Sequence, residues 1–525
     1  MKKWLYCALV WVFLLTQCAQ PAPTPTPPAS TATPAQTAYW PTQGWRTTTP
    51  EQQGMDSVRL VEAMDYLLEQ EEFRIHSLSI VRNGYLVLDA TFYPFQAGWK
   101  HDLASVTKSW TATLVGAALQ QGFIDSLEQR ALDFFTGRSV ANRDSRKEAA
   151  TVEDLLTMRS GLACVTYPTE VTLIEMLASP DWVQFSLDRP MAAAPGQRWV
   201  YDSSAVHLLQ GIIEQAAGMD TLDFAVHYLF DPLGISDIAW LTDPQGTNTG
   251  YGDLRMKPHD MAKLGYLYLQ DGTWEGQRLL PEGWVDAATQ PADGPQPSGS
   301  GYGYLWWLSP DDYSALGRGG QQVVVVPEEG MVLAITAGGG RSGTVISRLL
   351  STYILPACRS AAPLEANADA VAALQARVEQ AAAVPPFEPL PPPPLPQTAQ
   401  RVSGQEYALQ DNLPAFTHMT LTMYPPDEAG LRITAAGGPA GTGEWEWRAG
   451  LDDVPRTSPG RFGLPAMAKG SWTGDKTFLL QVDEIGNNFQ WELTLTFEGD
   501  SLAATMVDPG GFLTEPIQLQ GQLVR

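Results

Sequence analysis

The chain has 525 residues, of which 44% are hydrophobic and 17% charged, a balance that excludes a disordered chain and a membrane-embedded one. Its 58 acidic and 33 basic residues give a formal net charge of -25, which repels nucleic acid and anionic lipid and so excludes both as expected partners. The length is sufficient for two or more domains with sizeable cores.

The first 38 residues predict a targeting segment and a tether. In residues 1–18, two lysines precede an apolar stretch that is too short to span a bilayer and is typical of a secretory signal. Leu15-Thr16-Gln17-Cys18 resembles a bacterial lipobox, which implies that Cys18 is lipidated, although Gln17 departs from the expected small residue. The alternative is an ordinary signal peptide, and both predict an extracytoplasmic protein. Residues 19–38, rich in Pro, Thr and Ala, predict an extended tether.

Residues 39–358 have the pattern of an α+β domain. Asp56 or Ser57 is expected to cap a helix, and Asn83-Gly84 predicts the turn of a hairpin between strands 78–81 and 85–88. Periodicity predicts further helices at 109–120, 152–158, 205–217, 261–269 and 345–354, and strands at 302–308, 322–326 and 331–336. Strands at both ends predict one antiparallel sheet flanked by helices, with a helical lobe and a cleft between sheet and lobe.

The rest of the chain predicts a linker and a second, all-β domain. Residues 359–400 contain an Ala-rich helical segment, 367–381, and a proline-dense stretch, Pro385 to Pro396, which is stiff and extended. In residues 401–525, the alternation at 489–497 and shorter apolar runs predict a small antiparallel barrel or sandwich. Its tryptophans, Trp445, Trp447 and Trp472, either form a sugar-stacking surface or pack within the fold.

Ser105-Val106-Thr107-Lys108 has S-x-x-K spacing where a predicted helix begins. Residues three apart share one face of a helix, so the hydroxyl and the amine are expected to lie within reach of each other. A serine hydroxyl needs a neighbouring base, and a lysine can serve because burial disfavours its charged form. The alternative is a helix-capping serine with a solvated lysine.

Tyr201-Asp202-Ser203 has the form Y-x-[SN] and precedes the helix predicted over 205–217. A tyrosine beside Lys108 can relay a proton to a leaving group. The alternative is a helix cap at Asp202 or Ser203 that follows a packed tyrosine.

Gly317-Arg318-Gly319-Gly320-Gln321 leads into the strand predicted over 322–326. Glycines let a backbone approach a ligand, and one N–H here can join that of Ser105 to bind a developing oxyanion. The alternative is a plain glycine turn between strands. Together the three motifs predict an acyl-transferring serine hydrolase that needs no histidine, since the six histidines are scattered and no G-x-S-x-G elbow occurs.

In this order and separation, the motifs resemble those of the serine β-lactamase and penicillin-binding protein superfamily, class C-like branch, which also holds esterases, D-stereospecific peptidases and 6-aminohexanoate-dimer hydrolases. Stretches at 50–55, 155–162, 195–196 and 302–307 are also similar to that family, and the resemblance covers 39–358. It implies a β-lactamase/transpeptidase-like fold, acylation of Ser105 and proton transfer by Lys108 and Tyr201. It also implies no cofactor, and substrate or oxyanion contacts from Ser203, Arg318, Gly319, Gly320 and Gln321.

Two departures from the family pattern bear on the substrate. Arg318 stands where β-lactamases carry lysine, and Gly319 replaces a hydroxyl residue that helps to hold the substrate carboxylate in drug-binding members. Arg318 can still pair a carboxylate, or it can face an acidic residue of the protein itself. We therefore expect hydrolysis of a small ester or amide rather than β-lactamase activity. The alternatives are a non-catalytic or slowly acylating penicillin-recognising or cell-wall-binding lipoprotein, and a chain that mainly presents its C-terminal domain to a surface partner.

Two cysteines, Cys164 and Cys358, remain after Cys7 in the signal segment and Cys18. Export permits a disulfide between them, and the alternative is two buried free thiols. The chain has no C-x-x-C and no H-E-x-x-H, so no metal site is predicted. Contact with a membrane is expected only through an N-terminal lipid anchor.

Overall fold

The computed structural model describes residues 39–70, 73–167, 170–339, 342–412, 414–437, 441–510, 513 and 515–525. The predicted signal peptide, the tether and Cys18 lie outside these residues. Among the helices in the described ranges, none combines the length and the apolar character needed to cross a bilayer.

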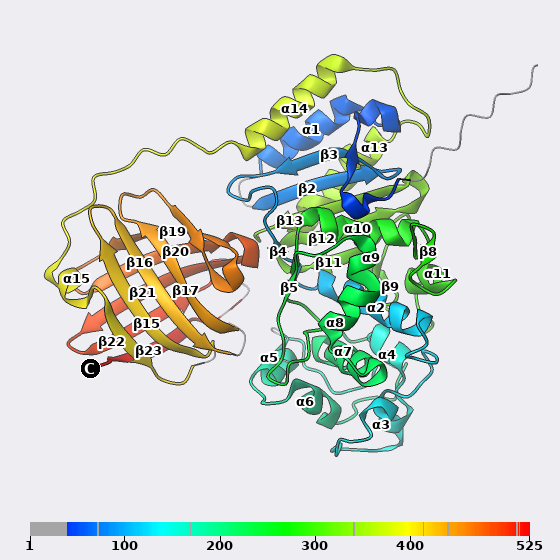
Figure 1. The fold of residues 1–525 in the computed structure, drawn as a ribbon, viewed down its shortest axis with the longest axis horizontal. Helices are drawn as coiled ribbons and strands as arrows, with labels where there is room; N and C mark the ends of the chain where they lie inside the picture. Colours follow the sequence, from blue (N-terminus) through cyan, green and yellow to red (C-terminus); the bar gives the residue numbers. More distant parts are fainter. Residues whose placement is uncertain are drawn as a thin grey trace, which may run out of the picture. The chain divides into compact units, whose positions relative to one another are not determined.

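One sheet carries the first part of the fold, and its strands come from both ends of the segment, as predicted (Figure 1). In the described residues the strand order is β1-β3-β2-β13-β12-β11-β10-β9, antiparallel except for the pair β1 and β3. The strands are β1 (Arg46–Thr47), β2 (Ile75–Arg82), β3 (Tyr85–Thr91), β9 (Gly301–Tyr302), β10 (Trp307–Leu308), β11 (Tyr313–Gly317), β12 (Gln321–Val326) and β13 (Met331–Ala337). The predicted hairpin turn is confirmed, because Asn83 and Gly84 have φ of 50° and 76°.

Helices bury both faces of this sheet. Val323 and Val325 of β12 pack on the side of α10, whereas Val324 and Val326 belong to the core under α1. Since both faces are covered, the central strands carry continuous apolar runs, Val323 to Val326 in β12 and Met331 to Ile335 in β13. The covering helices are α1 (Ser57–Leu68), capped by Asp56 as predicted, α2 (Val106–Gln120), α10 (Pro258–Leu269), α12 (Ser342–Arg348), the π-helical η7 (Leu349–Ile354), α13 (Leu355–Ala357) and α14 (Ala368–Ala382).

The central stretch forms the predicted helical lobe, in which α7 packs against α2. Its helices are α3 (Ser145–Ala149), α4 (Val152–Leu156), α5 (Val171–Leu177), α6 (Trp182–Asp188), α7 (Ser203–Ala217), α8 (Thr221–Ala225), the π-helical η4 (Val226–Phe230), α9 (Asp231–Leu233) and α11 (Trp284–Ala288). Short strands accompany them: β4 (His101–Asp102), β5 (Ala239–Trp240), β6 (Leu254–Met256), β7 (Thr273–Trp274) and β8 (Gln277–Arg278).

The prediction of one strand over 302–308 is wrong. The segment forms two short strands, β9 and β10, which pair antiparallel across a tight bend. At that bend Leu305 has a positive φ of 57°. A Cβ on Gly303 would lie 2.0 Å from the carbonyl oxygen of Ala288, so a glycine is required where the chain turns against the lobe. The aromatic residues give this segment a high strand propensity, but packing against the lobe bends the chain in the middle of the segment.

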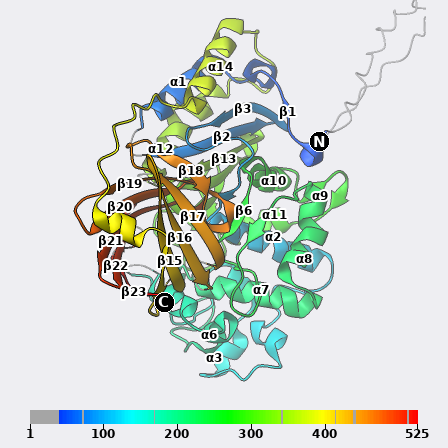
Figure 2. The same ribbon diagram turned by 60° about the vertical axis from the view of Figure 1, so that its left-hand side comes forward.

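The C-terminal strands form a closed barrel rather than a sandwich, which decides between the two predicted forms. In the described residues the strand order is β17-β16-β15-β14-β23-β22-β21-β20-β19-β18, and closure comes from a parallel pairing of β17 with β19. Figure 2 shows β15, β16 and β17 side by side in the barrel wall. The elements are α15 (Gln397–Val402), β14 (Gln405–Leu409), β15 (Phe416–Tyr424), β16 (Glu428–Ala436), β17 (Thr442–Gly450), β18 (Arg456–Pro459), β19 (Pro465–Trp472), β20 (Thr477–Glu484), β21 (Phe489–Glu498), β22 (Ser501–Val507) and β23 (Ile517–Leu523).

The barrel tryptophans belong to its interior. Trp447 is 1% exposed and Trp445 8% exposed, and Trp472 lies against Phe478 and Phe497. The structure therefore supports the interpretation in which these tryptophans pack within the fold. The division of the chain into separate domains at 359–400 stays a prediction.

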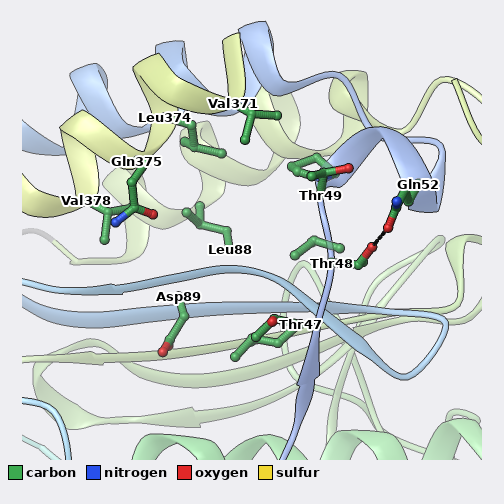
Figure 3. Close-up of a pocket in the computed structure, with 13 residues that line it drawn as sticks. Thr47, Thr48, Thr49, Gln52, Leu88, Asp89, Val371, Leu374, Gln375 and Val378 are labelled. Atoms are coloured by element: carbon green, nitrogen blue, oxygen red, sulfur yellow. Dashed lines mark hydrogen bonds between the residues drawn. The ribbon is translucent and has the colours of Figure 1, made fainter. Parts of the chain in front are cut away.

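A groove of about 530 Å³ lies where α14 crosses β3. Figure 3 shows Leu374 and Val378 of α14 facing Leu88 of β3, with the polar side chains of Thr48 and Gln52 hydrogen-bonded to each other at one end. The lining contains none of the predicted catalytic or substrate-contact residues, although Pro50 and Gln52 come from the family-like stretch at 50–55.

Candidate active site

Ser105 stands at the first turn of α2, directly after a bend in the backbone. Ala104 has a left-handed conformation, with a φ of 47°. Such a conformation is uncommon for a residue other than glycine and recurs at functional turns. Ser105 occupies the N-cap position, yet its side chain makes no capping hydrogen bond. The interpretation of Ser105 as a helix-capping serine is therefore wrong.

Lys108 is only 2% exposed, so the interpretation of it as a solvated lysine is also wrong. Its Nζ donates to Ser105 Oγ at 2.9 Å and to the backbone carbonyl of Tyr251 at 2.9 Å. A neutral amine has two N–H groups and one lone pair. With one N–H directed at Tyr251, the lone pair of a neutral Lys108 can accept the proton of Ser105.

Tyr201 lies on the other side of the lysine, with Lys108 Nζ 4.7 Å from the centroid of its ring. That ring stacks on Trp307, with centroids 6.0 Å apart and planes inclined by 24°. Asp202 caps α7 by accepting the N–H of Ala205 at 3.0 Å. The predicted helix cap at Asp202 is confirmed, and the Tyr201 ring lies beside Lys108. The role of Tyr201 in proton transfer stays a prediction.

Ser203 is the first residue of α7 and is buried. In the part of the chain that the structure describes, its Oγ has no hydrogen-bond partner. The structure thus brings Ser203 to the start of the helix without joining its hydroxyl to Lys108.

The Gly-rich turn lies directly beside the bend that precedes Ser105. A Cβ on Gly317 would lie 2.5 Å from the carbonyl oxygen of Leu103, so only glycine lets β11 come this close. Gly319 and Gly320 have φ of 81° and 104°, a region that disfavours other residues. The turn is therefore shaped by its glycines at the point where it faces the nucleophile segment.

Gln321 is fully buried, and its side chain is engaged inside the protein. Its Nε2 donates to the carbonyls of Arg318 at 3.1 Å and Ala337 at 2.7 Å, and its Oε1 accepts the N–H of Ala337 at 3.0 Å. These bonds tie the turn to β13, so any contact of Gln321 with a substrate would have to come from its main chain.

Arg318 faces an acidic residue of the protein itself. Its Nη2 lies 4.0 Å from Asp102 Oδ2, while Oδ1 of the same carboxylate accepts the N–H of Ala104 at 3.0 Å. Its guanidinium carbon lies 4.3 Å from the centroid of the Phe489 ring, and the side chain is 28% exposed. Arg318 therefore faces an acidic residue of the protein itself, which is the second of the two alternatives for this side chain.

Charge is concentrated beside this arginine. Burial raises the pKa of the Asp253 carboxyl, and Asp102 raises it further, while Arg255 and Arg318 oppose both effects. Burial also lowers the pKa of His101 to about 4, and its Nδ1 lies 2.7 Å from the backbone oxygen of Asp102. His101 is therefore neutral at pH 7 and adds no positive charge beside Asp102.

Three contributors to the site were missed by sequence reasoning. Tyr251 acts through a backbone carbonyl, which leaves no signal in a sequence. Asp102 lies three residues before Ser105, and this closeness in the sequence is the only feature that could have indicated its part in the site. Asn488 comes from the barrel and donates its Nδ2 hydrogen bond to the carbonyl of Arg318 at 2.9 Å, across 170 residues of chain.

The predicted disulfide is absent, because Cys164 and Cys358 are both free thiols in the structure. Burial raises the pKa of the Cys164 thiol to about 12, and this thiol lies near Asp202 and Arg189 in the lobe. Cys358 Sγ lies 3.9 Å from Met331 Sδ at the sheet, and burial raises the pKa of that thiol to about 11. The two thiols have different neighbours, which accounts for the missing bridge.

Among the residues that the structure describes, no three His, Cys, Asp or Glu side chains come together in a way that would hold a metal ion. The polar groups at Ser105 are hydroxyl, amine and backbone amide groups, which are the components of acyl transfer.

Comparison with known proteins finds a matching family and several similar proteins. The family model described as Beta-lactamase matches residues 60–345. The 6-aminohexanoate-dimer hydrolase of Paenarthrobacter ureafaciens is 23% identical over 293 residues, which is 51% of this chain and 74% of that protein. A candidate 6-aminohexanoate-dimer hydrolase from Bacillus anthracis has a similar fold, with a TM-score of 0.50 and 19% identity over 62% of this chain and 88% of that one. An octameric penicillin-binding protein homologue from Pyrococcus abyssi has a TM-score of 0.46 and 16% identity over 89% of this chain and all of that one.

Proposed function

The chain belongs to the beta-lactamase family, and from this we propose that it is a serine hydrolase that cleaves a small ester or amide through a covalent acyl-enzyme on Ser105. One observation carries the proposal. The Oγ of Ser105 lies 2.9 Å from the Nζ of Lys108, a buried amine held by the carbonyl of Tyr251. This pairing is the arrangement of a nucleophile with its base.

Acylation follows from these contacts. Lys108, when neutral, takes the proton of Ser105 as its Oγ attacks the carbonyl carbon of the substrate. The tetrahedral oxyanion is stabilised by peptide N–H groups at Ser105 and Gln321. Proton transfer from Lys108, with Tyr201 beside it, delivers a hydrogen to the leaving alcohol or amine as the carbon–heteroatom bond breaks. Water then attacks the ester on Ser105 and releases the acid.

The substrate expected here lacks a carboxylate beside the bond that is cleaved. Arg318 stands where drug-binding relatives hold such a carboxylate, and its guanidinium lies against Asp102 and the ring of Phe489. The similar protein from Paenarthrobacter ureafaciens is named for a linear amide, which supports the inclusion of amides beside esters. Trp307, half-buried against Tyr201, offers an apolar wall for the acyl or leaving group.

We also propose that the enzyme is exported and works on a small molecule outside the cytoplasm. The basic and apolar signal-like segment supports export, and Cys18 supports attachment to a membrane through lipid. A radiolabelled fatty acid precursor tests the anchor, because a Cys18→Ser variant should lose the label.

Two covalent probes test the proposed chemistry. A fluorophosphonate probe should label the wild-type protein and not the Ser105→Ala variant, whereas fluorescent penicillin should label neither. Labelling by penicillin alone would favour the slowly acylating penicillin-recognising protein, and labelling by neither probe would contradict the covalent mechanism. Chromogenic esters, linear amides and a cephalosporin then rank the substrates.

A further inference from the structure

A loop of the barrel contacts the Gly-rich turn of the active site. The short helix η10 (Ile485–Asn487) ends at Asn488, which has a φ of 58°, and β21 begins at Phe489. The Nδ2 of Asn488 donates to the carbonyl of Arg318 at 2.9 Å. In the described residues its Oδ1 accepts no hydrogen bond, so the amide nitrogen makes the polar contact. Phe489 covers the guanidinium of the same arginine.

This contact explains why residue 319 is glycine. A Cβ on Gly319 would lie 2.0 Å from Nδ2 and 2.2 Å from Oδ1 of Asn488. The amide therefore occupies the space that a side chain at residue 319 would need. Arg318 and Gly319, the two departures from the family pattern, thus both contact the barrel loop.

The carbonyl that Asn488 binds also fixes the entry to β12. Arg318 oxygen accepts hydrogen bonds from Asn488 and from the side chain of Gln321, at 2.9 and 3.1 Å. The main chain of Gln321 follows three residues later and is the expected oxyanion donor. A shift of the Arg318 peptide would therefore move the N–H of Gln321 relative to Ser105.

The loop is held firmly on the barrel side. Arg461 forms a buried ion pair with Glu484 at 2.6 Å, and Glu484 also accepts the indole N–H of Trp491 at 3.0 Å. Asn487 donates to the carbonyl of Arg461 at 3.2 Å and accepts from Arg255 at 3.1 Å. With these neighbours fixed, Asn488 is presented in one position rather than on a free loop tip.

We propose that Asn488 is a positioning residue for the oxyanion-binding turn, so that the barrel completes the active site. Its role rests on the proposed acyl-enzyme chemistry. Asn488 touches no reacting atom and acts through the Arg318 peptide on the N–H of Gln321.

The test compares two variants at the contact between barrel and sheet. Asn488→Gly removes the amide and tolerates the positive φ, so it avoids backbone strain. Asp483→Asn is the matched control, because Asp483 pairs with Arg74 across the same contact but does not touch the turn. Both proteins are assayed with a chromogenic ester, and amide hydrogen exchange is measured for peptides that span 317–321.

Asn488→Gly should lower kcat roughly tenfold with KM changed less than about twofold, since misplaced catalytic groups slow the chemical step. Exchange at 317–321 should become faster in this variant. Asp483→Asn should change neither kcat nor this exchange. Equal losses in both variants would show that the contact only docks the barrel, and wild-type behaviour of Asn488→Gly in both assays would overturn the proposal.

Hydrogen exchange also separates this proposal from the proposed function. If the wild-type protein turns over no ester and resists the fluorophosphonate, the acyl-enzyme function fails. Faster exchange at 317–321 in Asn488→Gly would then still show that Asn488 holds the turn, and unchanged exchange would reject that as well.

Discussion

Replacement of Lys108 by methionine tests the assignment of the base most directly. Methionine fills a similar volume, so the variant removes the amine while it keeps most of the packing around a side chain that is 2% exposed. Two hydrogen bonds of Nζ are lost, one to Ser105 and one to the carbonyl of Tyr251. The variant therefore affects both the chemistry and the local structure, and the two effects need separate measurements.

The expected magnitudes follow from these contacts. Loss of a general base lowers the rate by about 10²–10⁴-fold, which corresponds to about 3–5 kcal/mol of transition-state stabilisation. The carbonyl of Tyr251 loses a buried partner, which costs about 1–3 kcal/mol of folding free energy. The catalytic loss should therefore exceed the loss of stability.

Lys147 offers a matched control. It is 3% exposed, and its Nζ donates to two backbone carbonyls, Ala141 and Leu187, both at 2.7 Å. Lys147→Met leaves two backbone carbonyls without this partner, so it should lower the free energy of unfolding at least as much as Lys108→Met does, and it should leave kcat/KM within about twofold of wild type. The assays are ester hydrolysis, the rate of fluorophosphonate labelling, and unfolding in urea.

Two results would refute the reasoning. If Lys108→Met keeps its labelling rate, the base is another group. If Lys147→Met loses activity to the same extent, the rate effect comes from destabilisation and not from the missing amine.

Three other variants or treatments test the structure around the site. Gly319→Ser should lower the melting temperature and activity, because its Cβ meets the side chain of Asn488 at a φ of 81°; an unchanged protein would contradict the packing. Burial lowers the pKa of His101 from 6.5 in the unfolded chain to about 4 in the folded protein. As the pH falls from 6.5 to 4, the unfolded state therefore binds a proton before the folded state does, and the free energy of unfolding falls by about 3 kcal/mol. His101→Gln should remove that part of the pH dependence of unfolding. The prediction is contradicted if the free energy of unfolding varies with pH in the same way in the variant and in the wild-type protein. Alkylation in denaturant without reductant should modify both Cys164 and Cys358, whereas a peptide pair joined by a disulfide would contradict the free thiols.

Local patterns predicted much of the fold and the centre of the site. Spacing of three along a helix places Ser105 and Lys108 on one face, and the structure has their side chains 2.9 Å apart. The Asn83-Gly84 turn and the alternation in β21 depend only on neighbouring residues, and both elements form where predicted. The prediction of one strand over 302–308 is wrong, because the aromatic composition of this segment favours a strand whereas contact with the lobe bends the chain there.

The sequence by itself identified the candidate nucleophile, the candidate base and the kinds of structural element, since these depend on spacing over a few residues. Only the tertiary structure decided what Arg318 faces, that the carbonyl of Tyr251 holds Lys108, and that Asn488 rests on Gly319. Backbone carbonyls are identical in every residue, and contacts across 170 residues depend on how sheets and barrel pack. For this reason the chemistry of Ser105 could be predicted from residues close to it in the sequence. The residues that surround the site and select its substrate are brought there by long-range packing.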